Sequence, residues 1–355
     1  MLRAPLVGKA PFTDNMRLGS RMDRRAFLAA AAACSAVSAS TAQLARAQAP
    51  RRFGEALAYS AQRNGAAVIV VRHGVVLGED YPGANADMRH PIGTATRVFT
   101  PVLAASLAEE RLLNLDEPVA ATLGDWGAHP VKSTISIRVL LSGASGIAFG
   151  RARDRSLAAA IALEPVDQPG QRFHDDPAPY VLFTEIARRK LEARGREPDP
   201  ARWLTTRTLL PIGCVPIGWA RGGDGAPRFD DGAAVSARGF AAVGELIRRD
   251  GVWRAQQLAH AGVIGEALRG SFAEARAGFG LWLAAPGRGD DPTESDLWRG
   301  RSPAPATLAM ASGQGGQRLY ISPTEGLVVV RQARSMSASN QWSDAQFLSL
   351  IYRDL

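Results

Sequence analysis

Two β-hairpins, one near each end of the chain, limit the fold more than any other feature of the sequence. Residues 66–79 hold two apolar runs joined by Arg72-His-Gly, and residues 318–330 hold two more joined by Pro323-Thr-Glu-Gly. Short apolar runs that flank a glycine-containing turn are typical of antiparallel hairpins. With helices and loops between them, the two hairpins predict one antiparallel sheet that takes strands from both ends of the chain.

Amphipathic segments beside these hairpins predict the helices that cover the sheet. Residues 53–60 present an apolar helix face, and Ser343 with Gln346 forms a capping box ahead of a last amphipathic helix. We expect these two terminal helices on one face of the sheet. Residues 98–280 are expected to form a mainly helical lobe. The predicted fold class is therefore α/β (α+β), with two lobes in one domain.

The chemistry of the chain is concentrated between the hairpins, in the segment His90-Pro-Ile-Gly-Thr-Ala-Thr-Arg, which opens a predicted helix. Apolar residues recur in this helix at a helical spacing, namely Val98, Val102, Leu103, Leu107 and Leu112. Thr94 and Arg97 lie three positions apart in the first turn and therefore share one face. A hydroxyl followed by a cation one turn later is the layout of the S-x-x-K motif, in which the serine attacks and the lysine takes or relays its proton. Here the motif reads T-x-x-R.

The first 49 residues have the pattern of an export signal. Arg24 and Arg25 precede an alanine-rich apolar run, and Ala45-Arg-Ala offers small residues for cleavage, as in a twin-arginine signal peptide. The apolar run is too short and too weakly apolar for a membrane span. We therefore expect residues 1–49 to be a twin-arginine signal peptide and residues 50–355 to be a mature domain in the periplasm.

Most of the formal net charge of +8 belongs to this leader. It holds seven Lys or Arg and two Asp or Glu, a net +5, so that +3 remains for residues 50–355. No basic run interleaved with aromatic residues follows, and we expect no nucleic-acid partner. Cys214 has no histidine near it in the sequence, so we interpret it as a small apolar filler rather than a nucleophile.

Six segments occur in an order that resembles a known enzyme family. They span residues 93–99, 112–119, 135–147, 169–173, 231–241 and 313–317. This order is similar to that of β-lactamase and penicillin-binding-protein-like serine hydrolases, in particular the branch of class C β-lactamases, related esterases and aminohexanoate-oligomer hydrolases. The resemblance covers nearly all of residues 53–355 and implies a β-lactamase/transpeptidase-like fold with an acyl-transfer site. We expect no cofactor.

The departures from this family fall on the catalytic motifs. Thr94 replaces the nucleophilic serine: it offers a hydroxyl and, through its N–H, half of an oxyanion hole, while a helix-capping threonine is an equally good interpretation. Arg97 replaces the lysine and cannot act as a base, because a guanidinium stays protonated. It can hold a carboxylate of a ligand or of Asp175, and we favour the internal pair. Lys132, in a loop, and Lys190, at a helix end, are poor substitutes.

The second family motif, Y-x-N, falls on Asp175, Asp176 and Pro177, so the phenol and the amide are missing. Asp175 is a candidate base, but a neighbouring arginine lowers the pKa of a carboxyl group and makes it a weak base for an alcohol. His174 beside these acids suggests a metal site. Adjacent loop residues seldom face one centre, however, and we expect no metal.

The third motif is glycine-rich and has Gln314 where the family often has histidine or lysine. The predicted catalytic residues are Thr94, Arg97 and Asp175. The other residues expected in the cleft or oxyanion hole are Asp176, Pro177, Gln314, Gly315 and Gly316. Trp282 fits either a cleft wall or the core.

Three functions remain open at this level. The first is a family member that binds a small-molecule or peptidoglycan-like ligand in the cleft with weak or no turnover. The second is a divergent hydrolase of ester or amide bonds with Thr94 as nucleophile, assisted by water or Asp175. The third is an envelope protein that keeps the scaffold for its surface. We favour the first, and the sequence leaves the ligand and the oligomeric state open.

Overall fold

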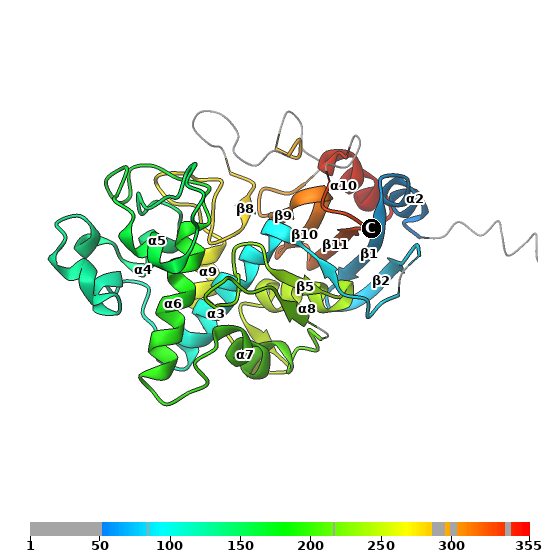
Figure 1. Cartoon of the computed structure of the whole chain (residues 1–355). Helices are drawn as coiled ribbons and strands as arrows, with labels where there is room; N and C mark the ends of the chain where they lie inside the picture. The colour runs from blue at the N-terminus through cyan, green and yellow to red at the C-terminus, as the bar shows by residue number, and fades with distance from the viewer. Residues whose placement is uncertain (1–51, 84, 216, 286–294, 299–303, 338–341) are drawn as a thin grey trace, which may run out of the picture. The chain divides into compact units, whose positions relative to one another are not determined.

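A computed structural model describes residues 52–83, 85–215, 217–285, 295–298, 304–337 and 342–355. Figure 1 shows the arrangement of its helices and strands. The predicted leader lies outside the described residues. In the described part of the chain, no helix has the length and hydrophobicity needed to cross a membrane.

Both predicted hairpins form, and they meet in one antiparallel sheet. The strands, in their order across this sheet, are β2 (Val75–Asp80), β1 (Gly65–Arg72), β11 (Leu327–Ala333), β10 (Gln317–Ser322), β9 (Ala309–Gly313) and β8 (Trp282–Leu283). The pair β1–β11 joins the two ends of the chain, with Ile69 opposite Val330. The prediction of a sheet built from both ends is therefore confirmed.

Alternation along β1 directs its side chains to two separate cores. Val68 and Val70 pack with residues of α2 (Gly54–Gln62) and α10 (Asp344–Arg353), the predicted terminal helices. Ile69 and Val71 point to the opposite face, which α8 (Ala237–Arg248) covers. The sheet is thus the middle layer between α8 and the two terminal helices (Figure 1). Ser343 caps α10 as predicted, since its Oγ accepts a hydrogen bond from the Gln346 N–H at 2.9 Å.

The second lobe is mainly helical, as predicted, although α8, which lies within the predicted range 98–280, covers the sheet instead. The helices of the second lobe are α3 (Phe99–Glu109), α4 (Ile137–Leu141), α5 (Leu157–Ala162), α6 (Ala178–Glu192), α7 (Pro200–Leu204), the π-helical turn Thr205–Leu209 and α9 (Ala261–Ala267). Short strands are β3 (His90–Pro91), β4 (Ile217–Trp219), β5 (Ala233–Val235), β6 (Val252–Trp253) and β7 (Gln256–Gln257). Short 3-10 turns are η1 (Gly93–Val98), η2 (Val119–Ala121), η3 (Gly124–Ala128), η4 (Lys132–Thr134) and η6 (Gln314–Gly316).

The predicted central helix is shorter than its apolar pattern suggests. Its first residues form the 3-10 turn η1, and the α-helix α3 ends at Glu109 rather than near Leu112. Arg111 adopts a φ of 57°, and the N–H of Leu112 returns to the carbonyl of Leu107 at 2.8 Å. This left-handed residue closes the helix by satisfying one of its last carbonyl groups.

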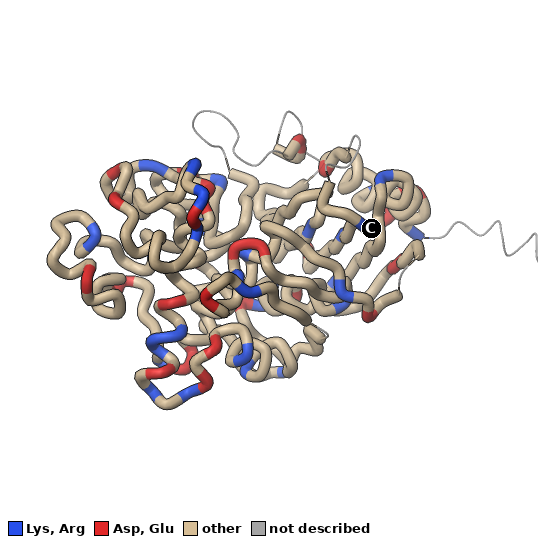
Figure 2. The backbone as a smooth tube through the Cα atoms, viewed as in Figure 1, with Lys and Arg blue, Asp and Glu red and all other residues tan. Residues whose placement is uncertain are grey.

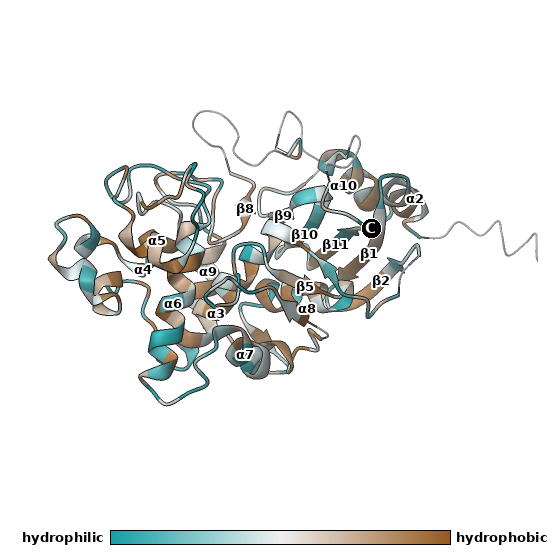
Figure 3. Ribbon diagram, viewed as in Figure 1, coloured by the Kyte–Doolittle hydropathy of each residue, from teal (hydrophilic) through white to brown (hydrophobic). Residues whose placement is uncertain are grey.

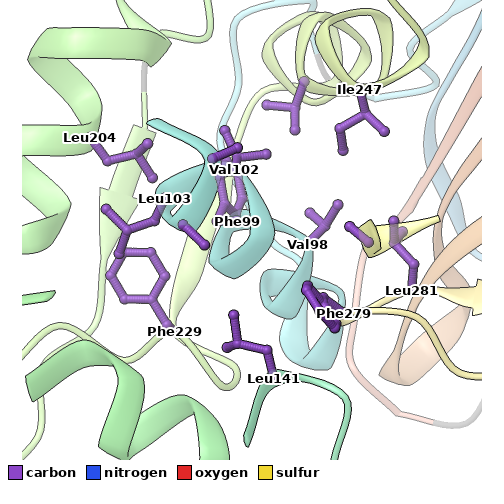
Figure 4. Close-up of a cluster of buried hydrophobic side chains, with 14 of the residues drawn as sticks. Val98, Phe99, Val102, Leu103, Leu141, Leu204, Phe229, Ile247, Phe279 and Leu281 are labelled. Carbon is purple, nitrogen blue, oxygen red and sulfur yellow. The ribbon is translucent and has the colours of Figure 1, made fainter. Parts of the chain in front are cut away.

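The helix α3 is the central element of the helical lobe. All its residues from Phe99 to Leu107 are buried. Figure 4 shows Phe99, Val102 and Leu103 among side chains from other elements, including Leu204 and Phe229. A helix that is buried on all sides is a rigid support, and η1 at its N-terminal end is fixed by it.

Surface charge is mixed in sign. Figure 2 shows Lys and Arg beside Asp and Glu over the helical lobe, and Figure 3 shows that the later part of α6 is hydrophilic. Glu185 there binds both Arg188, at 2.7 Å, and Arg189, at 2.6 Å. Pairing of this kind leaves no large surface of one sign on this helix.

Candidate active-site cleft

Two glycines bring η1 against the end of β9. A Cβ on Gly313 would lie 2.0 Å from the carbonyl oxygen of Ile92, so only glycine permits this approach of two backbones. Gly93 has a φ of 55°, and a Cβ there would lie 2.2 Å from Oε1 of Gln314. These contacts place Thr94 directly beside the third motif.

The hydroxyl and the backbone amide of Thr94 both have partners within the protein. Its Oγ1 donates to the carbonyl oxygen of Ser312 at 3.0 Å, and its N–H donates to Oε1 of Gln314 at 3.1 Å. Oγ1 also lies 3.5 Å from that same amide oxygen. Neither Ser312 nor Gln314 offers a group that can take a proton at physiological pH. Among the described residues, no histidine, lysine or carboxylate hydrogen-bonds this hydroxyl.

Arg97 pairs with Asp175, as predicted from the sequence. Its Nη1 contacts Asp175 Oδ1, and its guanidinium lies 4.8 Å from the centre of the Tyr180 ring. The Arg97 side chain is 13% exposed and that of Asp175 46%. Burial by itself lowers the pKa of Arg97, but Tyr180 and Asp175 outweigh burial and raise it. Arg97 is therefore a permanent cation that holds a carboxylate.

Tyr180 also lines the cleft, although it is not among the site residues predicted from the sequence. It is the third residue of α6, five positions after Asp175. Burial raises its pKa to about 12, and Asp175 adds to this effect while Arg97 opposes it. The phenol is therefore neutral at physiological pH. A tyrosine in the first turn of the helix that follows the second motif was the sequence signal that could have indicated this position.

Asp176 and Pro177 do not line the cleft, contrary to expectation. Asp176 is buried, and its carboxylate accepts three backbone N–H groups, from Phe149 at 2.9 Å, Gly150 at 2.9 Å and Ala178 at 2.8 Å. Pro177 is the residue before α6. Because Asp175 points to the cleft, the next side chain along the loop turns inward, and Asp176 anchors the loop to the helix instead.

Gly315 and Gly316 also lie outside the cleft lining, unlike Gln314. Their carbonyl oxygens each accept from Nη1 of Arg331 at 2.8 Å. Arg331 is fully buried and stacks over the ring of Trp342 at 4.2 Å. The two glycines thus attach the third motif to the sheet, and the Gln314 side chain occupies the place where the Thr94 N–H would bind a substrate oxygen.

The remaining candidates for chemistry lie elsewhere. Lys132 contacts Glu164 at 3.4 Å, and Lys190 contacts Glu117 at 2.6 Å. His174 binds Asp167 at 2.8 Å. Cys214 is buried, and burial raises the pKa of its thiol. Within the described ranges, no three His, Cys, Asp or Glu side chains are grouped so as to hold a metal ion.

Aromatic side chains complete the cleft, which has a volume of about 210 Å³. Trp282 and Phe173 meet edge to face at 5.9 Å. The other lining residues are Thr94, Arg97, Leu141, Gly143, Asp175, Tyr180, Ala277, Gly278, Gly280, Leu281, Ser312 and Gln314. Of the predicted site residues, the fold brings Thr94, Arg97, Asp175 and Gln314 together, and these come from η1, the loop before α6 and η6, which follows β9.

Comparison with known proteins places this architecture among solved folds. The family model described as Beta-lactamase matches residues 42–346, whereas no curated protein sequence matches. A family VIII carboxylesterase structure is 18% identical, with a TM-score of 0.67, and 86% of this chain covers 98% of that one. A penicillin-binding protein homologue from Caulobacter crescentus is 18% identical, with a TM-score of 0.66 and the same coverage, 86% and 98%. A D-alanine carboxypeptidase from Burkholderia cenocepacia is 16% identical, with a TM-score of 0.58 and coverage of 86% and 96%.

Proposed function

The chain belongs to the β-lactamase family, and on that basis we propose that it binds a ligand in the cleft but turns it over slowly or not at all. The observation that supports this proposal is the state of Thr94. Its hydroxyl donates to the Ser312 carbonyl and has no base among its partners in the described structure. An alcohol with an unperturbed proton is a poor nucleophile, and activation by an adjacent base is what acyl transfer needs.

The neighbouring groups do not supply this base. Arg97 stays protonated, and Asp175 forms a salt bridge with it. Tyr180 holds its proton, since its pKa is about 12. In addition, Gln314 occupies the Thr94 N–H, so a substrate carbonyl must first displace an internal hydrogen bond before its oxygen can be stabilised.

The cleft is suited to a small ligand with hydrogen-bonding groups. Trp282 and Phe173 offer apolar contact area, while Ser312 and Gln314 offer polar atoms in the same lining. Small-molecule or peptidoglycan-like fragments carry both kinds of group. We propose such a ligand because solved relatives include a carboxylesterase and a penicillin-binding protein homologue.

A divergent hydrolase is the second candidate, because Thr94 keeps a hydroxyl in the cleft. Intact-mass spectrometry after exposure to β-lactams, activated esters and a phosphonate tests it, together with nitrocefin and ester hydrolysis. We expect no more than slow adduct formation. Thr134→Ala is the matched control, because the Thr134 hydroxyl also donates to a backbone carbonyl, at 2.8 Å, but lies outside the cleft.

The outcomes separate the candidates. Brisk hydrolysis that disappears in Thr94→Ala and persists in Thr134→Ala would establish the hydrolase and refute the binding protein. Ligand-induced thermal stabilisation without turnover, lost in Trp282→Ala, supports the binding protein. If no member of the panel stabilises the protein, while periplasmic proteins bind to it, the scaffold serves as an interaction surface.

We also propose export by the twin-arginine route, on the sequence pattern around Arg24 and Arg25. Replacing both by lysine keeps the charge but removes the signal that the transport receptor reads. Cell fractionation should then show precursor retained inside the cell. The same change at Arg17 and Arg21 is the control and should leave export unaffected; equal export of both variants contradicts the assignment.

A further inference from the structure

A second cavity lies in the helical lobe and shares no residue with the cleft. Its volume is about 970 Å³, against about 210 Å³ for the cleft. Small-molecule sites range from about 300 to 1,000 Å³. This cavity is open to solvent, since Arg155, Gly223 and Asp224 in its lining are exposed, and its volume lies within that range.

The cavity is built between α6, the start of α5, the start of α7 and the loop that precedes β5. The first turn of α6 separates it from the cleft: Tyr180 lines the cleft, and Val181 lines the cavity. Its apolar lining comprises Leu157, Val181, Pro198, Pro200, Ala226, Pro227 and Phe229. Phe229 packs against Trp219 with ring centres 4.5 Å apart, so this part of the wall rests on the buried core.

Charged side chains surround these apolar residues, and seven of the ten form ion pairs with one another. Arg188 contacts Glu185 at 2.7 Å and Glu192 at 2.9 Å. Arg221 binds Asp199, and Arg228 binds Asp230 at 3.1 Å. The two further acids are Asp154 and Asp224, which accept backbone N–H groups of Ser156 at 2.9 Å and Ala226 at 3.0 Å.

Arg155, also in this lining, is exposed, and its charge acts on Asp231 outside the lining rather than on one of the lining carboxylates named above. It does not make the cavity basic, because six carboxylates and four arginines line it. A charged ligand that contacts the paired groups would have to break a pair and leave one partner uncompensated, which is unfavourable. Asp154 and Asp224 are outside these pairs, but both are exposed, so a cation bound to them would gain little. An anion would also meet the excess of carboxylates. The apolar wall therefore favours an uncharged ligand.

We propose that this cavity is a binding site for an uncharged, apolar small molecule of aryl or short acyl chemistry. The site is independent of the cleft, and therefore of the function proposed for the cleft. Val181, Leu157 and Ala226, all half-buried, form the contact surface, which Phe229 supports from the core at 2% exposure. The paired charges act as a fixed polar rim. Thr184 also lines the cavity, but its hydroxyl needs no hydrogen bond from a ligand because it already donates to the carbonyl of Tyr180 at 2.8 Å.

The test uses the neutral fluorescent probe N-phenyl-naphthylamine with the mature chain. Gly223 lines the cavity, and a Cβ there meets nothing within 4 Å, so Gly223→Trp adds bulk without backbone strain. We expect saturable binding to the unmodified protein and a dissociation constant at least about tenfold weaker in Gly223→Trp. Gly127→Trp is the matched control, because a Cβ on Gly127 also meets nothing within 4 Å but this glycine lies outside the cavity.

Leu157→Glu is the second variant. It places a charge in the apolar wall, while a carboxylate in the first turn of α5 suits the helix dipole and should preserve the fold. Circular dichroism and thermal melting check that each variant folds. Trp282→Ala changes only the cleft and should leave probe binding within about twofold of the unmodified protein.

Three results would overturn the proposal. The first is the absence of saturable probe binding to the unmodified protein. The second is binding that survives both Gly223→Trp and Leu157→Glu but is lost in Trp282→Ala, which would place the probe in the cleft. The third is tighter binding of the anionic probe anilinonaphthalene sulfonate that is lost in Arg155→Ala, which would make the cavity an anion site.

Discussion

At the residue scale, the chemistry of the cleft depends on which proton each side chain can release. A lysine can lose its proton when burial or its neighbours favour the neutral amine, whereas an arginine cannot. Arg97 therefore changes the role of its position from proton transfer to holding Asp175. Tyr180 and Thr94 keep their own protons, so the cleft contains hydrogen-bond donors but no evident base among the described residues.

Repair of the first motif alone should not produce a good enzyme. The double variant Thr94→Ser/Arg97→Lys supplies a serine and an amine, but Asp175 favours the charged form of that amine. Catalytic groups that act together are strongly non-additive. We expect slow acylation visible by mass, and hydrolysis far below a typical rate of about 10 per second. Measurement of nitrocefin and ester hydrolysis checks this.

A quadruple variant that adds Asp175→Tyr and Pro177→Asn is the companion to this experiment. It restores the phenol at the position that faces the cleft. Because Pro177 lies at the helix start, outside the cleft lining, we expect Asp175→Tyr to account for most of any gain. Fast hydrolysis by the double variant would mean that the second motif is not the obstacle.

At the element scale, buried carboxylates attach helix ends to their surroundings. Asp176 ties the start of α6 to the loop at Phe149 and Gly150. Asp344 at the start of α10 binds Arg318 of β10 at 2.8 Å and also accepts from the Tyr320 hydroxyl. Both junctions fix where an element begins relative to a distant part of the chain.

Replacement of Asp176 by alanine should destabilise the fold by about 1–3 kcal/mol, because three buried N–H groups lose their acceptor. Asp176→Asn keeps one acceptor oxygen, so its free energy of unfolding should lie between those of the unmodified protein and Asp176→Ala. Chemical denaturation with equal m-values in all three proteins measures the difference. Asp154→Ala is the control and should cost less, since Asp154 is exposed and accepts the backbone N–H of Ser156 at 2.9 Å without pairing with a buried cation. An unchanged free energy of unfolding in Asp176→Ala contradicts the anchoring role.

Asp344 should make stability sensitive to acid. Burial by itself raises its pKa, but Arg318 and the hydrogen bonds outweigh burial and lower it from 3.8 to about 2. Because the pKa in the folded protein is depressed, the ionised group stabilises the fold fully above about pH 4. That contribution, on the order of 2 kcal/mol, is lost as the pH falls toward 2.

Denaturation between about pH 2 and 5 tests this dependence. Asp344→Asn should be less stable at neutral pH by about 3–5 kcal/mol, since it leaves Arg318 buried without its partner, and its stability should change less with acid. The exposed Asp125 provides the control variant Asp125→Asn. If Asp344→Asn keeps the full acid dependence of the unmodified protein, another carboxylate is responsible.

At the scale of the whole molecule, the sheet closes the fold from both ends. β1 pairs with β11, and α2 packs on α10. Residues from the first and last parts of the domain therefore share one core, which includes Phe53, Val70 and Phe347. This core takes its residues from both ends of the domain, so it forms only after the long chain segment between them has been brought into place. The entropy cost of closing that segment must be met before the core contacts can form.

Removal of residues 342–355 should consequently unfold the entire sheet layer rather than one helix. The deletion takes away α10 with Phe347 and Ile351, and uncovers Val68 and Val70. We expect loss of near-UV circular dichroism and of a cooperative melting transition. Removal of residues 1–49 is the control and should leave both signals intact, as the predicted domain boundary requires. A truncated protein that still melts cooperatively contradicts the shared core.

Patterns within a few residues of each other could be read from the sequence by itself. The two hairpins, the Ser343 cap and the terminal helices are of this kind, because alternation and capping depend on neighbours along the chain. The family order of segments also indicated that Thr94, Arg97, Asp175 and Gln314 would meet. The pairing of Arg97 with Asp175 could then be predicted as well, because opposite charges in one narrow cleft attract each other.

Only the tertiary structure decided how each side chain at the site is used. Asp176 turns inward because three backbone N–H groups converge there from separate segments, and Tyr180 reaches the cleft because α6 begins beside Arg97. The bond of Gln314 to the Thr94 N–H depends on two glycines that let η1 and β9 touch. The large cavity arises between elements far apart in the chain. Such features depend on distances through space, which a local pattern of residues does not specify.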